Sequence, residues 1–274
     1  MGDDFMKRKL ITIDLDGTTL NSESKISPKT KQTLQKVGQA GHIVSIVTGR
    51  PYRISKHIYD ELGIKTPLIN FNGALGHLPH QSWDKEYSKT FSKKIALDLV
   101  SAKDELGIKL ITAEGKNYAL ADKASEIIKD FFPSSLKSTE ILNKINLQQD
   151  PSAMTMLVDE NKKSEIITSL ENTFGDTINV SVWGGEHPIL ELSPKGVSKA
   201  DGLEFLSNIY DINREDIIAF GDEQNDETMI EYAGLGIVMQ NGTDKLKSIA
   251  DDITEFDNNH DGLAKHLEKI LKLD

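Results

Sequence analysis

Two aspartates one residue apart, Asp14 and Asp16, directly follow a mostly apolar run at residues 10–13. Runs of isoleucine and leucine are typical of buried strands, and Gly17 with two threonines after it predicts the sharp turn that ends this strand. The strand then delivers both carboxylates to its carboxyl end, where open α/β sheets usually bind ligands. Because two adjacent carboxylates repel each other, the pair needs a cation, and a hard, oxygen-preferring ion such as Mg²⁺ fits it.

A second acidic cluster, far along the chain, repeats this arrangement. The apolar residues 217–220 lead to Asp222, and Asn225 and Asp226 follow just before a helix predicted over residues 227–233. Two such strand ends placed side by side form a carboxylate cage for one metal ion. Taken alone, the first aspartate pair is also compatible with a solvated turn in which an aspartate caps the next helix.

Asp14 is the candidate nucleophile of this site. A carboxylate that attacks phosphorus forms an acyl phosphate, which divides one hard displacement into two easier ones. Asp16 reaches the same space from the turn, so it can protonate the leaving oxygen and then deprotonate the incoming water. Such acid–base help contributes about 10²–10⁴-fold. The alternative role of Asp16 is a structural one, as a helix cap.

Residues that bind a phosphoryl group are predicted at two further places. Thr48 and Gly49 end the apolar strand at residues 42–47, where a hydroxyl and a glycine amide can approach phosphoryl oxygens. Taken alone, they are equally compatible with a plain strand-to-helix turn. A cation is also needed, and Lys195 and Lys199 compete for this role. We favour Lys199, because it opens a predicted helix whose positive dipole end suits an anion.

The second acidic cluster completes the predicted site. Asp222 is expected to be the third metal ligand, after Asp14 and the backbone carbonyl of Asp16. Asn225 lies one helical turn further on and can donate a hydrogen bond to phosphate. Asp226 either holds a metal-bound water or orients the lysine.

The composition restricts the partner and the compartment. The chain has 274 residues, a formal net charge of −11 and no cysteine. The negative charge argues against a nucleic-acid or anionic-membrane partner, because nothing supplies the counterion-release term. The lack of cysteine excludes disulfides, thiolate nucleophiles and sulfur metal sites. No run approaches the roughly 20 apolar residues of a membrane span, and the start lacks the apolar segment of a signal peptide. We expect a cytoplasmic protein that acts on a small phosphorylated metabolite.

The order of the predicted elements indicates an α/β protein with an insertion. Residues 9–72 alternate strand, helix, strand, helix and strand, which is typical of a parallel sheet whose crossovers place the strand ends on one edge. From about residue 82 the pattern changes to a mixture of alternating strands and polar helices. The predicted strands are 118–121, 154–158 and 178–183, and the predicted helices are 92–106 and 161–174. From Ile189 the strand–helix alternation resumes and carries the second acidic cluster.

Together, four segments resemble the haloacid dehalogenase (HAD) superfamily, and specifically its Cof-type sugar-phosphatase branch. In chain order they are Asp14-Leu15-Asp16-Gly17-Thr18, Thr48-Gly49-Arg50, Lys199 and Gly221-Asp222-x-x-Asn225-Asp226. Asn72-Gly73-Ala74 also matches the family's usual strand end before the cap. The resemblance implies an α/β fold: a Rossmann-like parallel-sheet HAD core at residues 1–81 and 189–274, with an inserted α/β cap, the substrate-specificity domain, at residues 82–188.

The resemblance also implies a role for each motif residue in a Mg²⁺-dependent phosphatase. Asp14 would be the nucleophile and a metal ligand, and Asp16 the acid–base residue that binds the metal through its carbonyl. Asp222 would complete the metal site, with Asp226 behind it. The residues expected to hold the phosphate are the amide of Leu15 together with Thr48, Gly49, Lys199 and Asn225.

Three other functions share parts of this site. A phosphomutase uses all of it, but needs a bisphosphate activator and releases no net phosphate. A metal-dependent glycosyltransferase also uses Asp-x-Asp with a divalent ion, but has no use for Lys199 beside the Gly-Asp-x-x-Asn-Asp motif. A phospho-acceptor switch would not need Asp16 placed to hydrolyse the acyl phosphate. The sequence favours a phosphatase and does not identify its substrate. The candidate leaving-group contacts are Trp83, His80, Tyr87, Trp183 and His187.

Overall fold

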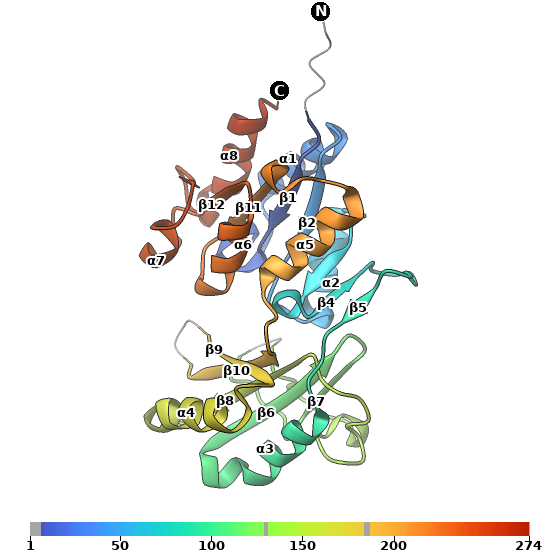
Figure 1. The fold of residues 1–274 in the computed structure, drawn as a ribbon, viewed down its shortest axis with the longest axis vertical. Coiled ribbons are helices and arrows are strands. Elements are labelled where there is room, and N and C mark those ends of the chain that lie inside the picture. The colour runs from blue at the N-terminus through green and yellow to red at the C-terminus, as the bar shows by residue number, and fades with distance from the viewer. Residues whose placement is uncertain (1–6, 129–130, 184–186, 274) are drawn as a thin grey trace, which may run out of the picture. The chain divides into compact units, whose positions relative to one another are not determined.

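The structure, a computed structural model, describes residues 7–128, 131–183 and 187–273. Its elements form two compact units (Figure 1). The first unit comprises Met1–Arg50, Ser55–Glu86 and Ser198–Asp274, and the second comprises Pro51–Ile54 and Tyr87–Val197. The second unit is therefore inserted into the chain of the first.

A five-stranded parallel sheet forms the centre of the first unit, in the order β13-β12-β11-β1-β2. Its strands are β1 (Leu10–Ile13), β2 (Ile43–Ile46), β11 (Ile217–Gly221), β12 (Leu235–Val238) and β13 (Asp252–Ile253). All residues of β1, β2 and β11 are buried, as expected for strands of a parallel sheet that is covered on both faces.

Helices cover both faces of this sheet. They are α1 (Pro28–Gln39), α2 (Tyr52–Leu62), α5 (Lys199–Tyr210), α6 (Glu227–Tyr232), α7 (Asp244–Lys247) and α8 (Gly262–Leu271). Apolar side chains of α5 and α6 share one core cluster with those of β1, β2 and β11. On the opposite face, His266 of α8 contacts the ring of Phe220 edge-on. In Figure 1, α5 and α6 lie in front of the sheet.

The third predicted strand continues this sheet for a short distance. In β3 (Leu68–Asn70), Ile69 forms a parallel bridge to Val47, directly after β2. The same strand also begins a three-stranded sheet of order β3-β4-β5, with β4 (Leu75–His77) and β5 (Tyr87–Ser88). The predicted sequence of parallel strands in the first part of the chain is thus confirmed.

The second unit contains an antiparallel sheet of order β7-β6-β8-β10-β9. Its strands are β6 (Ile108–Gly115), β7 (Tyr118–Ala121), β8 (Ala153–Val158), β9 (Ile178–Val182) and β10 (Ile189–Pro194), and its helices are α3 (Lys93–Leu106) and α4 (Lys163–Phe174). Alternate strand residues such as Ile111 and Ala113 pack with both helices in one apolar cluster. The predicted strands and helices of the insertion are confirmed, and β6 is an additional strand.

The structure corrects one predicted boundary. The sequence analysis ended the insertion at residue 188 and assigned the strand that begins at Ile189 to the parallel-sheet core. That strand, β10, instead pairs antiparallel with both β8 and β9. The reason is its alternating pattern: Leu190 and Leu192 face the apolar cluster of the second unit, whereas Glu191 and Ser193 do not. The chain returns to the first unit only at Ser198.

The α/β fold class is confirmed by the parallel sheet with helices on both faces and by the inserted antiparallel sheet. No helix in the described ranges combines the length and the apolar character that crossing a membrane requires.

Candidate active site

Strand register brings the predicted motifs to one edge of the parallel sheet. Ile13, the last residue of β1, lies between Ile46 of β2 and Phe220 of β11. The residues that follow these strands therefore emerge side by side, and the amide of Asp14 donates to the carbonyl of Phe220 at 3.1 Å. This register explains how motifs from both ends of the chain form one site.

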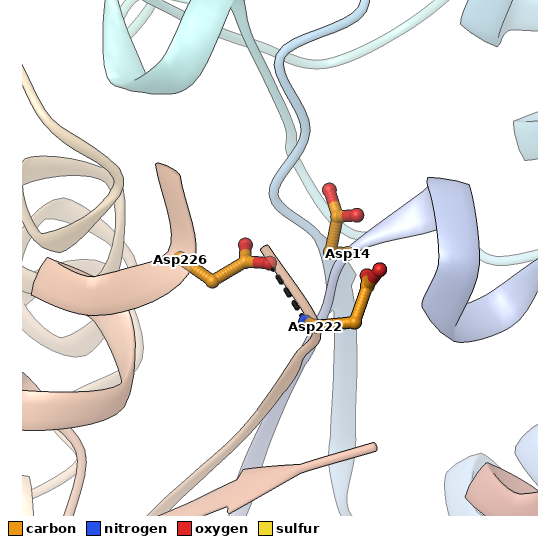
Figure 2. Close-up of side chains that lie close together, drawn as sticks. All are labelled: Asp14, Asp222 and Asp226. Carbon is orange, nitrogen blue, oxygen red and sulfur yellow. Dashed lines mark hydrogen bonds between the residues drawn. The ribbon is translucent and has the colours of Figure 1, made fainter. Parts of the chain in front are cut away.

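Three carboxylates converge at this edge. Asp14, Asp222 and Asp226 each offer an oxygen that lies within 4.8 Å of the others, and all three residues are buried (Figure 2). Burial, together with the nearby charges of Asp226 and Asp16, raises the pKa of Asp14 to about 7, although the charge of Lys199 opposes this shift. Burial likewise raises the pKa of Asp222 to about 8, with Asp14 and Asp226 adding to the shift. The buried surroundings therefore stabilise the charged forms of these carboxyl groups less well than water does.

Lys199 supplies a positive charge to this cluster. Its side chain is completely buried, and its Nζ donates to Asp14 Oδ1 and to Asp226 Oδ1, each at 2.6 Å. Burial alone would lower the pKa of Lys199, but the charges of the two carboxylates raise it above its usual value. Lys199 is the first residue of α5, which begins with a capping box between Ser198 and Asp201. The competing Lys195 is exposed on the preceding turn.

Asp226 holds this arrangement together. While one of its oxygens accepts from Lys199, Oδ2 accepts from the backbone amides of Asp222 at 2.9 Å and Glu223 at 3.1 Å (Figure 2). The side chain also packs closely on Gly221, where a Cβ would lie 2.5 Å from the Asp226 Cβ. Of the two predicted roles of Asp226, the geometry supports orienting the lysine. Both carboxylate oxygens are engaged by protein donors.

The turn after β1 fits closely around Asp222. It spans Leu15–Thr19 and is closed by a 2.8 Å hydrogen bond from the Leu20 amide to the Leu15 carbonyl. Gly17 has φ +67°, and a Cβ there would lie 2.1 Å from Asp222 Oδ2, so both the conformation and the space require glycine. Thr18 Oγ1 donates to Asp222 Oδ1 at 2.8 Å. The sequence analysis did not assign a role to this threonine.

Asp16 projects from this turn and pairs with an arginine. Its carboxylate accepts from Arg50 Nε at 2.7 Å and from Nη2 at 2.5 Å. The first α-helix after Asp16 begins at Pro28 and is capped by the Ser27 hydroxyl, so the interpretation of Asp16 as a helix cap is wrong. The arginine belongs to the second motif, and no role was assigned to it from the sequence.

The remaining predicted residues also lie at this edge. Thr48 is buried directly after β2, and its Oγ1 accepts from the amide of Arg50 at 3.1 Å. Gly49 lies close to the Asn72 side chain, where a Cβ would be 3.0 Å from Asn72 Oδ1. Asn225 is exposed, and its Nδ2 donates to Asn72 Oδ1 at 3.1 Å. Leu15 has a buried side chain at the start of the turn.

Asn72 is a site residue that the sequence analysis noted only as part of a strand end. It follows β3, has φ +52°, and bridges the second and fourth motifs through Gly49 and Asn225. The next residue, Gly73, lies against the start of α5, where a Cβ would be 2.1 Å from the Ser198 carbonyl oxygen. The available signal was the Asn-Gly pair, since both residues tolerate positive φ.

The aromatic and histidine residues proposed to contact the leaving group take part in contacts within each unit. Trp83 packs edge-on against Phe205, and His80 Nε2 pairs with Asp60 at 2.5 Å. Trp183 Nε1 donates to Glu191 at 2.8 Å in the second unit. The structure shows Tyr87 in β5, and His187 lies just before β10. These contacts do not identify the substrate.

The donor set fits a hard divalent cation. Asp14 and Asp222 offer buried carboxylate oxygens with raised pKa values, and a bound cation would favour their charged forms. The donors gathered at this edge are carboxylate oxygens, the ligands that Mg²⁺ prefers.

A family model for haloacid dehalogenase-like hydrolases matches residues 11–267. The chain therefore belongs to the haloacid dehalogenase-like hydrolase family, as the motifs predicted.

Two relatives and two solved structures support this assignment over nearly the whole chain. The 5-amino-6-(5-phospho-D-ribitylamino)uracil phosphatase YitU of Bacillus subtilis is 34% identical over 269 residues, or 97% of this chain and 99% of that protein. A second B. subtilis phosphatase of the same description, YcsE, is 29% identical over 258 residues, or 94% of this chain and 93% of that protein. A crystal structure of a haloacid dehalogenase-like hydrolase from Bacteroides thetaiotaomicron covers 96% of this chain and 100% of its own, with a TM-score of 0.82 at 25% identity. A structure described as a HAD subclass IIB sugar phosphatase shares the fold, with a TM-score of 0.78 at 20% identity, covering 97% of this chain and 100% of that one.

The family and the relatives make this chain an enzyme of the phosphatase class.

Proposed function

We propose that this protein is a Mg²⁺-dependent phosphatase that hydrolyses small phosphorylated metabolites through an aspartyl-phosphate intermediate on Asp14. The observation that carries the proposal is the position of Asp14, which is buried at the strand edge between the Lys199 ammonium and the Asp222 carboxylate. Asp16 lies two residues away on the adjoining turn. This combination supports both formation and hydrolysis of an acyl phosphate.

Each site residue then has a specific task. An Asp14 oxygen attacks phosphorus, and Asp16 first protonates the leaving oxygen and later takes the proton of the attacking water. The Leu15 amide, Thr48, Gly49, Lys199 and Asn225 hold the phosphoryl oxygens. Because most of the barrier in phosphoryl transfer is lowered by positioning and by charge, these fixed donors supply most of the catalysis.

Asp14, Asp222 and the backbone carbonyl of Asp16 would hold the magnesium ion, with Asp226 behind them. When bound, Mg²⁺ neutralises charge on the phosphoryl oxygens. Asp226 would keep Lys199 charged and directed at the nucleophile, through the 2.6 Å contact described above.

The relatives support a proposal for the substrate class. The name of the B. subtilis relative that is 34% identical describes a phosphatase of a ribityl phosphate attached to a pyrimidine. We propose that the substrate here is likewise a small phosphomonoester, such as a sugar phosphate or a sugar-alcohol phosphate. The second unit would select among such compounds as a cap domain. The net charge of −11 supports a small-molecule partner rather than a nucleic acid or an anionic membrane. The lack of cysteine is compatible with a cytoplasmic location, which cell fractionation can test.

The proposal is tested with a panel of sugar phosphates, sugar-alcohol phosphates and the ribitylamino-uracil phosphate, assayed for phosphate release with and without Mg²⁺. We expect release that needs Mg²⁺, is lost with a chelator and is lost in Asp14→Asn. Net release without a bisphosphate activator distinguishes a phosphatase from a phosphomutase. Hydrolysis that persists in the chelator, or in Asp14→Asn, would contradict the mechanism.

A further inference from the structure

Arg50, the arginine of the second motif, forms a bidentate contact with Asp16. Nε and Nη2 of Arg50 each donate to a different oxygen of the Asp16 carboxylate, at 2.7 and 2.5 Å. A bidentate pair of this kind fixes the plane of the carboxylate as well as its position. Both oxygens act as acceptors in this contact.

The arginine is the rigid partner of the pair. Its side chain is 15% exposed, whereas that of Asp16 is 59% exposed. The carbonyl of Arg50 accepts from Asn70 Nδ2 at 2.8 Å, and its amide donates to Thr48 Oγ1 at 3.1 Å. Asp16, by contrast, projects from the turn that follows β1.

Asn70 is itself fixed in the core. It is completely buried at the end of β3, where its Nδ2 also donates to Ser55 Oγ at 2.9 Å and its Oδ1 lies 3.0 Å from His77 Nε2. The backbone of Arg50 is thus attached to a buried residue of β3, which in turn contacts Ser55 of α2 and His77 of β4. This is the support that a precisely held functional group requires.

We propose that Arg50 is a positioning residue that holds the Asp16 carboxylate in place for the second half of the reaction. This inference rests on the proposed function. In that step, water attacks the phosphorus of the aspartyl phosphate, Asp16 takes the proton of the water, and the bond between phosphorus and the Asp14 oxygen breaks. The products are inorganic phosphate and the free Asp14 carboxylate. Lysine cannot replace the arginine, because an ammonium lacks the planar arrangement of N–H groups that donates two parallel hydrogen bonds to one carboxylate.

The alternative role for Arg50 is to bind the phosphoryl group of the substrate directly. The two roles differ in kinetics. Loss of a phosphate contact weakens the first step, so kcat/KM falls and KM rises. With a substrate whose leaving group needs little acid assistance, loss of Asp16 positioning slows mainly the second step, so the phosphoenzyme accumulates and kcat and KM fall together.

The test uses 4-nitrophenyl phosphate, whose good leaving group needs little acid assistance, with the Mg²⁺-loaded full-length enzyme. For Arg50→Ala we expect kcat to fall on the order of 10²-fold, KM to fall in parallel, and kcat/KM to stay within a few-fold. Rapid mixing should show a burst of nitrophenol equal to the enzyme concentration, with acid-stable phosphate on Asp14. Arg50→Lys should give the same burst, because it keeps the charge without the planar arrangement of N–H groups. Lys25→Ala removes a cation from an exposed ion pair and should match the parent.

A double-mutant cycle supplies the second measurement. If Arg50 acts through Asp16, adding Arg50→Ala to Asp16→Asn should change kcat little further. Additive effects, or a fall of kcat/KM with no burst in either Arg50 variant, would overturn the positioning role while leaving the proposed function intact. Failure of the proposed function has a different signature, which is full turnover by Asp14→Asn.

Discussion

The two sheets of this molecule use buried polar residues in opposite ways. In the parallel sheet, the acidic and hydroxyl groups of the site lie beyond the strand ends, at Asp14, Thr48 and Asp222. In the antiparallel sheet, equally buried polar groups such as Thr155 and Glu191 lie within the strands and face one another across β8 and β10. The parallel sheet thus places its polar groups together at one edge, whereas the antiparallel sheet places them across a face.

The position of a polar residue therefore indicates more about function in the parallel sheet than in the antiparallel sheet. A polar residue directly after a buried parallel strand lies at the ligand-binding edge whatever its neighbours are. A polar residue within an alternating strand has no such assigned place. We therefore expect changes at the edge to lower turnover, and matched changes on the antiparallel face to leave turnover of a simple substrate nearly intact.

The sharpest comparison uses two carboxylates of equal burial, Asp14 and Glu191, each 5% exposed. Asp14→Asn should lower kcat for 4-nitrophenyl phosphate by on the order of 10⁴-fold or more, because an amide is not a nucleophile. Glu191→Gln keeps an acceptor for Trp183 Nε1 and should change kcat only a few-fold. Steady-state assays of both variants measure the contrast, and comparable losses in the two would show that the comparison is mistaken.

The next effect in size concerns the two lysines that flank the return to the first unit. Lys199→Ala should lower kcat/KM by roughly 10²–10³-fold, since it removes a fixed positive charge beside the nucleophile. Lys195→Ala removes an exposed lysine and should leave kcat/KM near the parent value. Circular dichroism must show that both variants are folded. The reverse ranking would mean that the buried lysine acts only in structure.

A smaller effect is expected for a hydroxyl from each sheet. Thr48→Val should reduce kcat/KM about 10-fold, because it removes a donor at the phosphate edge. Thr155→Val, at a site of similar burial in β8, should leave 4-nitrophenyl phosphate turnover unchanged, and any effect should appear as altered ranking in the metabolite panel. A loss of basal turnover in Thr155→Val would place catalytic groups on the antiparallel face.

The smallest effect is a pH-dependent change in stability. Because the pKa values of Asp14 and Asp222 are raised to about 7 and about 8, the folded metal-free protein binds more protons than the unfolded chain between about pH 4 and 8. Its stability should fall as the pH rises through this range. Mg²⁺ binds the charged carboxylates, so it should raise Tm by a few degrees more at pH 8 than at pH 6.

Asp222→Asn is the matched control for that measurement. It keeps an acceptor for the Thr18 hydroxyl and removes one buried charge. Without metal at pH 8 its Tm should exceed that of the parent, and Mg²⁺ should add little. Equal Mg²⁺ shifts in the two proteins would show that the ion binds elsewhere.

The sequence was sufficient to predict the parallel strands and the residues at their ends, because both depend on local patterns. The apolar runs before Asp14, Thr48 and Asp222 indicated buried strands, and β–α alternation fixed their common direction. The arrangement of Asp14, Lys199 and Asp226 in space depends on the register of the strands, which the sequence alone does not reveal. The contact of Lys199 with both aspartates is therefore a structural finding.

The errors arose where a residue depends on partners that are distant in sequence. The strand at Ile189–Pro194 was assigned to the wrong sheet, although its alternation of Leu190, Glu191, Leu192 and Ser193 is typical of an antiparallel strand. The contacts of Arg50 were not predictable. Its guanidinium donates to Asp16, and its backbone carbonyl accepts from Asn70, a buried residue of β3.

The position of β1 has a consequence for biosynthesis. This strand is made first, yet it lies between β2 and β11, which is made only after the whole inserted unit. Residues 87–197 leave the ribosome as one continuous stretch and can fold while β1 is paired with β2 but still lacks β11. The catalytic edge cannot close until β11 has emerged. At this stage of translation the nascent enzyme carries the inserted unit and an exposed, apolar N-terminal sheet fragment, and we expect chaperones to engage it then.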